Sequence, residues 1–359
     1  MSEPTQEEVI SIVSSVFEIK SVNQNLDVLQ FEIEREGFKP KFVKLAQSLE
    51  SKNLVGRLEK FEDRVFLFVG RFHPPRLRRA WIPRILFAAT IAVVMIDGYY
   101  RTLETNSIVM IGDPLEMAGL YTVSLIGILG IHELGHIIAS KWHKIKTSWP
   151  YFIPGIPIIG FIPTFGALIM SRSFTINRDI LFDIGISGPI AGLIVAVVVS
   201  IYGAYLSPVI PESQAQQLIS QSQLFEIHES VIMKTTEVLA GKYIIGTEIV
   251  YSPVLLAAWF GFLITFLNLL PAWQLDGGHI ARATLGRKWH KITTYAGIGI
   301  LAILGFWFMA LFVLSFSMRS PDVRPLDDIS PLSSKRKKLF VLVIGLAVVC
   351  APLPFSILP

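Results

Sequence analysis

The chain has 359 residues, of which 52% are hydrophobic and 17% are charged; this composition is typical of an integral membrane protein and excludes a soluble domain of ordinary make-up. The formal net charge of +4 does not indicate a nucleic-acid partner, because the basic residues flank apolar stretches and do not form one face. The single cysteine, Cys350, excludes an internal disulfide and a cysteine-based zinc site, so a metal ion would need His and carboxylate ligands.

The first 75 residues are mixed in charge and soluble in character. Their patterns predict a helix over residues 7–17, a strand over 28–34, a helix over 42–49 and a strand over 65–69. We therefore expect a small soluble α+β domain at residues 1–75 and a membrane domain at residues 76–359. No catalytic constellation is present in the first of these, which favours a docking or regulatory module.

Six apolar stretches predict about six transmembrane helices. They run over residues 82–100, 117–141, 180–206, 253–273, 292–316 and 339–357. The expected fold class is a polytopic α-helical membrane protein, with a re-entrant loop or hairpin in addition to the spans.

The basic residues predict a cytoplasmic N-terminus. An arginine cluster precedes the first span, and lysines and arginines follow the second and fourth spans, so all three groups lie on one side. The loop between the fifth and sixth spans contradicts this scheme, because Arg319, Arg324 and Lys335 to Lys338 would lie outside. A re-entrant segment near the fifth span would remove the contradiction.

The second span contains an H-E-x-x-H motif formed by His132, Glu133 and His136, the only charged or imidazole side chains between Met117 and Ser140. Residues four apart lie on one face of a helix, so the two imidazoles can bind one metal ion. Zinc bound this way keeps a position for water, and the neighbouring carboxylate can accept a proton from that water. His132 would lie about 14 Å inside the helix end at 1.5 Å per residue, so the chemistry would take place within the membrane.

Residues 151–171 are apolar but are interrupted by prolines and glycines, which exclude a continuous helix and predict a re-entrant loop. Part of this loop could form a strand edge that binds an unwound substrate by β-augmentation. The expected substrate-binding residues are Phe165, Gly166, Ala167, Leu168, Ile169 and Met170. A simple connector that dips into the membrane is the alternative.

The third metal ligand should come from a distant segment, and Asp276 is the best candidate. Pro271 cannot continue a regular helix, and Gly277 and Gly278 permit turns, so the fourth span should be broken at the depth of the histidine pair. Two alternative ligands remain, Asp183 at the start of the third span and His279 just past the glycines.

Three segments together resemble the signature of the site-2 protease family of intramembrane zinc metalloproteases. They are His132-Glu133-Leu134-Gly135-His136, Ser187-Gly188-Pro189-Ile190-Ala191-Gly192, and Asn268-x-x-Pro271-x-x-x-x-Asp276-Gly277. The resemblance covers about residues 80 to 357, and the N-terminal domain and residues 150–171 resemble the plant plastid and archaeal branch of the family. The loop over residues 207–252 is too short for the PDZ module of some bacterial members.

The resemblance implies that His132, His136 and Asp276 bind one zinc ion and that Glu133 is the general base. It also implies that Asn268 holds the substrate carbonyl or its oxyanion, for which a cap on the broken helix is the alternative. The expected partners are a transmembrane protein substrate and the lipid bilayer, and the oligomeric state stays open.

The sequence thus predicts a multi-pass intramembrane zinc endopeptidase. A membrane zinc transporter or metal-binding protein is the alternative. A transporter would not need a general base, so the effect of changing Glu133 to Gln separates the two.

Overall fold

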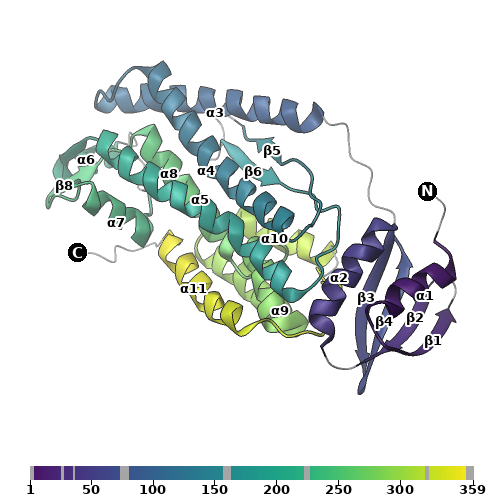
Figure 1. The fold of residues 1–359 in the computed structure, drawn as a ribbon. Helices are drawn as coiled ribbons and strands as arrows, with labels where there is room; N and C mark the ends of the chain where they lie inside the picture. The colour runs from purple at the N-terminus through teal and green to yellow at the C-terminus, as the bar shows by residue number, and fades with distance from the viewer. Residues whose placement is uncertain are drawn as a thin grey trace.

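The computed structural model describes residues 4–25, 28–34, 37–72, 81–156, 163–221, 227–319 and 323–352. Within these residues, an α+β unit of residues 4–72, here called the N-terminal unit, lies at one end of a bundle of long helices (Figure 1). Short helices and a small sheet lie at the other end of the bundle (Figure 1). The domain boundary expected after residue 75 falls in residues 73–80, outside the described residues.

The N-terminal unit is an antiparallel sheet of strand order β1-β2-β4-β3, covered on one face by two helices. Its elements are α1 (Gln6–Ser14), β1 (Ile19–Asn25), β2 (Val28–Ile33), α2 (Phe38–Ser51), β3 (Leu54–Phe61) and β4 (Arg64–Arg71). Leu58 and Leu67 of the sheet are buried in one cluster with Phe42 and Leu49 of α2. The sequence predicted both helices, β2 and β4. It did not predict β1 and β3, whose polar residues weaken the strand signal.

Three helices are long and apolar enough to cross a membrane, among the residues that the structure describes. They are α3 (Trp81–Ile108), α4 (Pro114–Trp142) and α5 (Arg178–Leu206). Asp113 caps the start of α4 and Asn177 caps the start of α5, because each side chain accepts at least one hydrogen bond from a backbone N–H group of the first turn. These helices agree with the first three predicted spans, and the count of six spans stays a prediction.

The fourth predicted span is broken, as the sequence indicates. Helix α8 (Pro253–Leu269) is buried along most of its length and ends before Pro271. A tight turn follows, in which Trp273 has a φ of 46°, and α9 (Asp276–Ile303) begins at once. A Cβ at Gly277 would lie 2.1 Å from the carbonyl oxygen of Leu269, so only glycine permits this close return of the chain.

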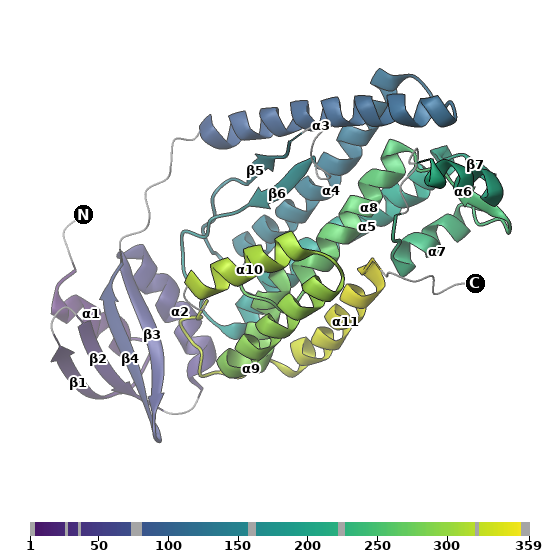
Figure 2. The same ribbon diagram turned by 180° about the vertical axis from the view of Figure 1, so that it is seen from behind.

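The fifth predicted span, residues 292–316, is wrong as a single helix. Helix α9 ends at Ile303, and α10 (Trp307–Arg319) returns along it after Gly305, which has a φ of 84° (Figure 2). The side chains of Phe312 and Phe316 in α10 pack against Trp273, whose backbone N–H donates to the Thr294 hydroxyl of α9. The apolar run thus forms a helical hairpin. Hydropathy alone cannot show where such a run reverses.

Residues 323–333, here called the linking segment, connect α10 to α11 (Ser334–Cys350) at the end of the bundle that carries the N-terminal unit (Figure 1). Lys39 of α2 donates to the carbonyl of Pro331 at 2.9 Å. Arg324 of this segment also donates to Glu59 of β3 at 3.2 Å, so the segment lies on the side of the N-terminal unit, whereas a single fifth span would place it on the opposite side. The end of the sixth predicted span, residues 353–357, lies outside the described residues.

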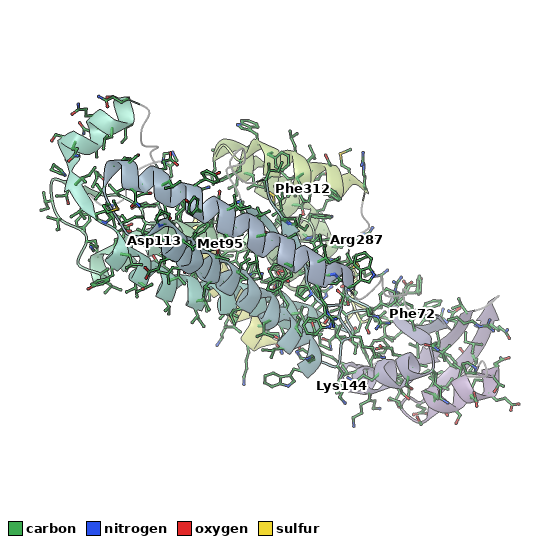
Figure 3. The ribbon with its side chains drawn as sticks, turned by 90° about the horizontal axis from the view of Figure 1, so that it is seen from above. Phe72, Met95, Asp113, Lys144, Arg287 and Phe312 are labelled. Atoms are coloured by element: carbon green, nitrogen blue, oxygen red, sulfur yellow. The ribbon has the colours of Figure 1, made fainter. Side chains whose placement is uncertain are left out.

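Two small sheets lie beside the bundle. Strands β5 (Tyr151–Pro154) and β6 (Thr164–Leu168) form an antiparallel pair that contacts α3. At the end far from the N-terminal unit lie β7 (Val209–Pro211), α6 (Glu212–Ser220), α7 (Val231–Leu239) and β8 (Thr247–Ile249). Figure 3 shows Asp113 and Lys144 at opposite ends of α4, and the Lys144 end faces the N-terminal unit, where Lys144 donates to Gln47 of α2.

Candidate metal centre

Two imidazoles from α4 point at one another, as the spacing of the motif predicts. The Nε2 atoms of His132 and His136 are 3.2 Å apart, and the two side chains are largely buried between α4 and α5. Glu133 follows His132 on the helix and is 8% exposed. The periodicity of α4 therefore provides two imidazoles that could bind a metal ion and an adjacent buried carboxylate.

Asp276, the first residue of α9, completes the cluster. Its Oδ2 atom lies 3.2 Å from Nε2 of His132 and 3.3 Å from Nε2 of His136. Ligand atoms about 2.0–2.1 Å from a tetrahedral zinc ion would lie about 3.3 Å from one another. The three atoms could thus form three corners of such a tetrahedron, and a bound zinc ion would keep its fourth position for a water or a substrate oxygen. This is the one group of three or more His, Cys, Asp or Glu found with metal-ligand spacing in the described residues.

Helix α5 fixes the orientation of the histidine rings. Nδ1 of His136 donates to the carbonyl of Ile184 at 2.7 Å, which leaves Nε2 as the atom that faces Asp276. A Cβ at Gly188 would lie 2.1 Å from the same Nε2, and a Cβ at Gly192 would lie 3.0 Å from Cβ of His132. The glycines of α5 therefore make room for both rings. In the sequence they belong to the second of the three segments that carry the family resemblance, and the structure places them against His136 and His132.

Asn268 lies at the cluster, in the last turn of α8. Its Nδ2 atom is 3.5 Å from Nε2 of His132. An amide at this place can donate a hydrogen bond to an oxygen that approaches the metal ion.

The alternative ligands lie elsewhere. The carboxylate of Asp183 is held by His143 at 2.9 Å and by Arg336 at 2.7 Å. His279 is one turn beyond Asp276 and is not part of the cluster of ligand atoms. Its Nδ1 is buried without a hydrogen-bond partner among the described residues. Asp276 is thus the third ligand that the geometry favours.

The expected substrate-binding segment contains a strand, but only part of it belongs to the strand. Phe165, Gly166, Ala167 and Leu168 lie in β6, and Ile169 and Met170 follow it. Phe165 and Leu168 are 53% and 59% exposed, whereas Ala167 packs against the main apolar cluster of the bundle. The re-entrant tip expected here falls largely in residues 157–162, outside the described residues.

The fold and the cluster together define a class of protein: a helical bundle with apolar membrane-length helices and a buried site of two histidines and one aspartate that can bind a metal ion. Comparison with known families agrees. The model of peptidase family M50 matches residues 120–312, and the chain belongs to this family. The match contains most of α4 and all of α5, α8 and α9, so it includes the whole cluster. The resemblance to the site-2 proteases is thereby confirmed.

Several curated proteins from plants are similar to this chain. The probable zinc metalloprotease EGY2, chloroplastic, of Arabidopsis thaliana is 31% identical over 236 residues, which cover 64% of this chain and 41% of the relative. The protein of the same name from Oryza sativa subsp. indica is 32% identical over 250 residues, with 65% and 42% covered. The probable zinc metalloprotease EGY1, chloroplastic, of A. thaliana is 29% identical over 229 residues, with 62% and 41% covered. The chain thus spans about two fifths of the length of these relatives. No solved structure matches the chain significantly.

Proposed function

We propose that this protein is an intramembrane zinc endopeptidase that hydrolyses a peptide bond within or near the transmembrane segment of a membrane-anchored protein. The observation that carries the proposal is the convergence of His132, His136 and Asp276 with tetrahedral spacing inside a bundle of membrane-length helices. Membership of peptidase family M50 and the relatives named as zinc metalloproteases support it.

His132, His136 and Asp276 would hold one zinc ion. When bound, zinc lowers the pKa of a coordinated water towards neutrality and polarises a carbonyl oxygen. The rest of the chemistry belongs to the chain. The carboxylate of Glu133 accepts the proton of the attacking water and then passes it to the nitrogen of the leaving amine. Its burial beside His132 keeps bulk water from competing for that proton.

Asn268 would orient the substrate. Its Nδ2 donates to the carbonyl oxygen of the scissile bond, and this hydrogen bond strengthens as negative charge develops on that oxygen. The contact between Asn268 and His132 supports this role more than a cap on the broken helix, because the amide faces the cluster.

Strand β6 would hold the substrate in an extended form. A helical substrate hides its peptide bonds, and pairing with a strand edge exposes them. In the two-stranded sheet, β5 pairs with one edge of β6, so the other edge can accept a third strand. The proposed contacts are those of Phe165 to Met170, of which Phe165 and Leu168 are the most exposed.

The protein would be a multi-pass membrane protein with about six spans and a cytoplasmic N-terminal unit. Lys144, Arg287 and the linking segment lie at the end of the bundle next to the N-terminal unit, and basic residues favour the cytoplasmic side (Figure 3). The site would lie within the membrane, nearer to that side.

Glu133→Gln tests the function. The purified variant should retain about one zinc ion per chain and lose cleavage of a co-reconstituted membrane substrate by at least about 100-fold. Candidate substrates come from comparing membrane-protein fragments in cells that contain the active protein or the variant. Glu116→Gln, an exposed change on the same helix, serves as the control and should cleave normally.

The transporter alternative gives different results. Vesicles that contain a transporter would take up zinc, and Glu133→Gln would not need to affect uptake. We expect no zinc flux above that of protein-free vesicles. Unchanged cleavage by Glu133→Gln, or zinc flux without any cleavage, would contradict the proposal.

A further inference from the structure

The linking segment joins the N-terminal unit to the start of α5 by backbone hydrogen bonds. The N–H of Leu58 in β3 donates to the carbonyl of Leu326 at 2.9 Å. On the other side, the N–H of Leu326 donates to Thr175 at 3.0 Å and that of Asp327 to Ile176 at 2.7 Å. The linking segment therefore lies between β3 and the residues that lead into α5, and pairs with both.

The same junction is apolar inside. Ile145, Ile176 and Ile180 of the bundle are buried in one cluster with the core of the N-terminal unit, and so is Leu326 of the linking segment. Residues from outside the N-terminal unit thus complete its core. An attachment of this kind is tighter than a flexible tether, because separation would expose apolar side chains on both sides.

One carboxylate at this junction holds three arginines from different parts of the chain. Asp328 accepts two hydrogen bonds from Arg282 of α9, at 3.1 and 2.7 Å. It also accepts one from Arg178, the first residue of α5, at 3.0 Å, and lies 3.6 Å from Arg324. Arg282 is 1% exposed, so this paired carboxylate compensates a buried charge.

Arg324 extends the network to the N-terminal unit. Its Nη1 is 3.2 Å from the carboxylate of Glu59 in β3. A chain of charged contacts therefore runs from Glu59 through Arg324 and Asp328 to Arg282 and Arg178.

Helices α9 and α5, which carry Arg282 and Arg178, also contact the metal cluster. Helix α9 begins at Asp276, six residues before Arg282. Helix α5 provides the Ile184 carbonyl that orients His136, and its Gly185 lies against the backbone of Asp276. A rotation or shift of α9 would therefore displace Oδ2 of Asp276, and a rotation or shift of α5 would displace Nε2 of His136. Either movement would change the distances between the ligand atoms.

We propose that Asp328 is a positioning residue for the metal centre. The N-terminal unit controls the geometry of this centre by holding the linking segment, through the contact of Leu58 with Leu326 and that of Glu59 with Arg324. The proposal rests on the proposed function, because the site that is positioned is the proposed protease site. The N-terminal unit thus has a function in catalysis, because it keeps α5 and α9 in their relative positions.

The test uses the full-length protein in detergent with three variants: Asp328→Asn, Arg324→Gln and Arg319→Gln. Arg319 is exposed at the end of α10 and is the matched control for Arg324. The readouts are zinc affinity by chelator competition, the visible spectrum of the Co²⁺-loaded protein, and the separate values of kcat and KM on a cleaved substrate. A purely structural role would lower the melting temperature without a change in the Co²⁺ spectrum.

We expect Asp328→Asn to weaken zinc affinity about tenfold and Arg324→Gln about threefold, each with an altered Co²⁺ spectrum and a loss in kcat that exceeds any change in KM. Arg319→Gln should match the parent protein. Parental zinc affinity and Co²⁺ spectrum in both Asp328→Asn and Arg324→Gln would overturn the inference.

Three further outcomes are also decisive. If Asp328→Asn does not fold because Arg282 loses its hydrogen bonds to Asp328, Arg324→Gln alone decides, since Arg324 is partly exposed and its loss leaves the contact between Arg282 and Asp328 in place. If the parent protein binds zinc but cleaves nothing, the proposed function fails, whereas zinc affinity and the Co²⁺ spectrum still decide the inference. If the parent binds no zinc at this cluster, both are overturned.

Discussion

Nδ1 of His136 donates a hydrogen bond of 2.7 Å to the backbone carbonyl of Ile184. This contact joins the motif of α4 to α5, and it selects the tautomer in which Nε2 carries the free lone pair. Because Nε2 is the atom that faces Asp276, the hydrogen bond prepares the ring for metal binding before any ion arrives.

The close packing of α5 on this ring gives a first prediction. Gly188→Ala should weaken zinc affinity by about 10- to 100-fold, because the added Cβ would lie 2.1 Å from Nε2 of His136 and displace the ring. Chelator competition measures the effect. Gly130→Ala in α4 is the control, since its Cβ would meet nothing within 4 Å. Equal zinc affinity in both variants would contradict the packing described here.

The identity of the third ligand gives a second prediction. Asp276→Asn should lower zinc affinity by more than about 100-fold and abolish cleavage. Loss of a metal ligand weakens zinc binding more than loss of a residue that only hydrogen-bonds to a ligand. His279→Gln, which changes a neighbouring residue outside the cluster, should retain zinc at one ion per chain. Metal analysis of the two purified variants distinguishes them. A reversed result would make His279 the ligand.

The edge of β6 gives a third prediction. A photo-crosslinking amino acid in place of Phe165 should trap a membrane substrate on the inactive Glu133→Gln protein. The same amino acid in place of Tyr205 should not, although Tyr205 is exposed too, because it lies on α5 far along the chain from the strand. Crosslinked products are identified by mass spectrometry. Equal trapping at both positions would argue against strand addition at β6.

A buried carboxyl in α7 gives a prediction for pH. Burial and the neighbouring Glu229 raise the pKa of Glu237 from 4.5 to about 8, against the opposing charge of Lys234. Tyr251 donates to Glu229 in the same cluster, to which Glu248 also contributes charge. The folded protein thus holds a proton that the unfolded chain releases above about pH 4.5, so the free energy of unfolding should fall as the pH rises from there to about 8.

Glu237→Gln removes this titration. The melting temperature of the variant in detergent minus that of the parent protein should be larger at pH 8.5 than at pH 5. Glu212→Gln on the exposed surface of α6 is the control and should show the same difference from the parent at both pH values. If Glu237→Gln also shows a constant difference, the carboxyl does not titrate in this range.

Local patterns in the sequence were sufficient for much of the molecule. Hydropathy located α3, α4 and α5, because a membrane-length apolar run is a property of consecutive residues. Helical periodicity placed His132 and His136 on one face, and Pro271 with Gly277 marked the break after α8. In the N-terminal unit, alternation found β2 and β4 but missed β1 and β3, whose polar residues are stabilised by pairing with neighbours.

The tertiary structure decided what depends on segments far apart in the chain. Asp276 reaches the histidines because α5 packs between α4 and α9, and Gly185 and Gly188 permit the close approach of these helices. No local sequence pattern predicts how closely distant helices pack. The reversal between α9 and α10 depends on packing around Trp273, so one apolar run was read as one span. The linking segment joins Leu58 to Thr175 across the fold by backbone hydrogen bonds, which are nearly independent of side-chain identity. The sequence by itself thus determined the chemistry of the candidate site, and the burial of distant faces against one another decided its geometry.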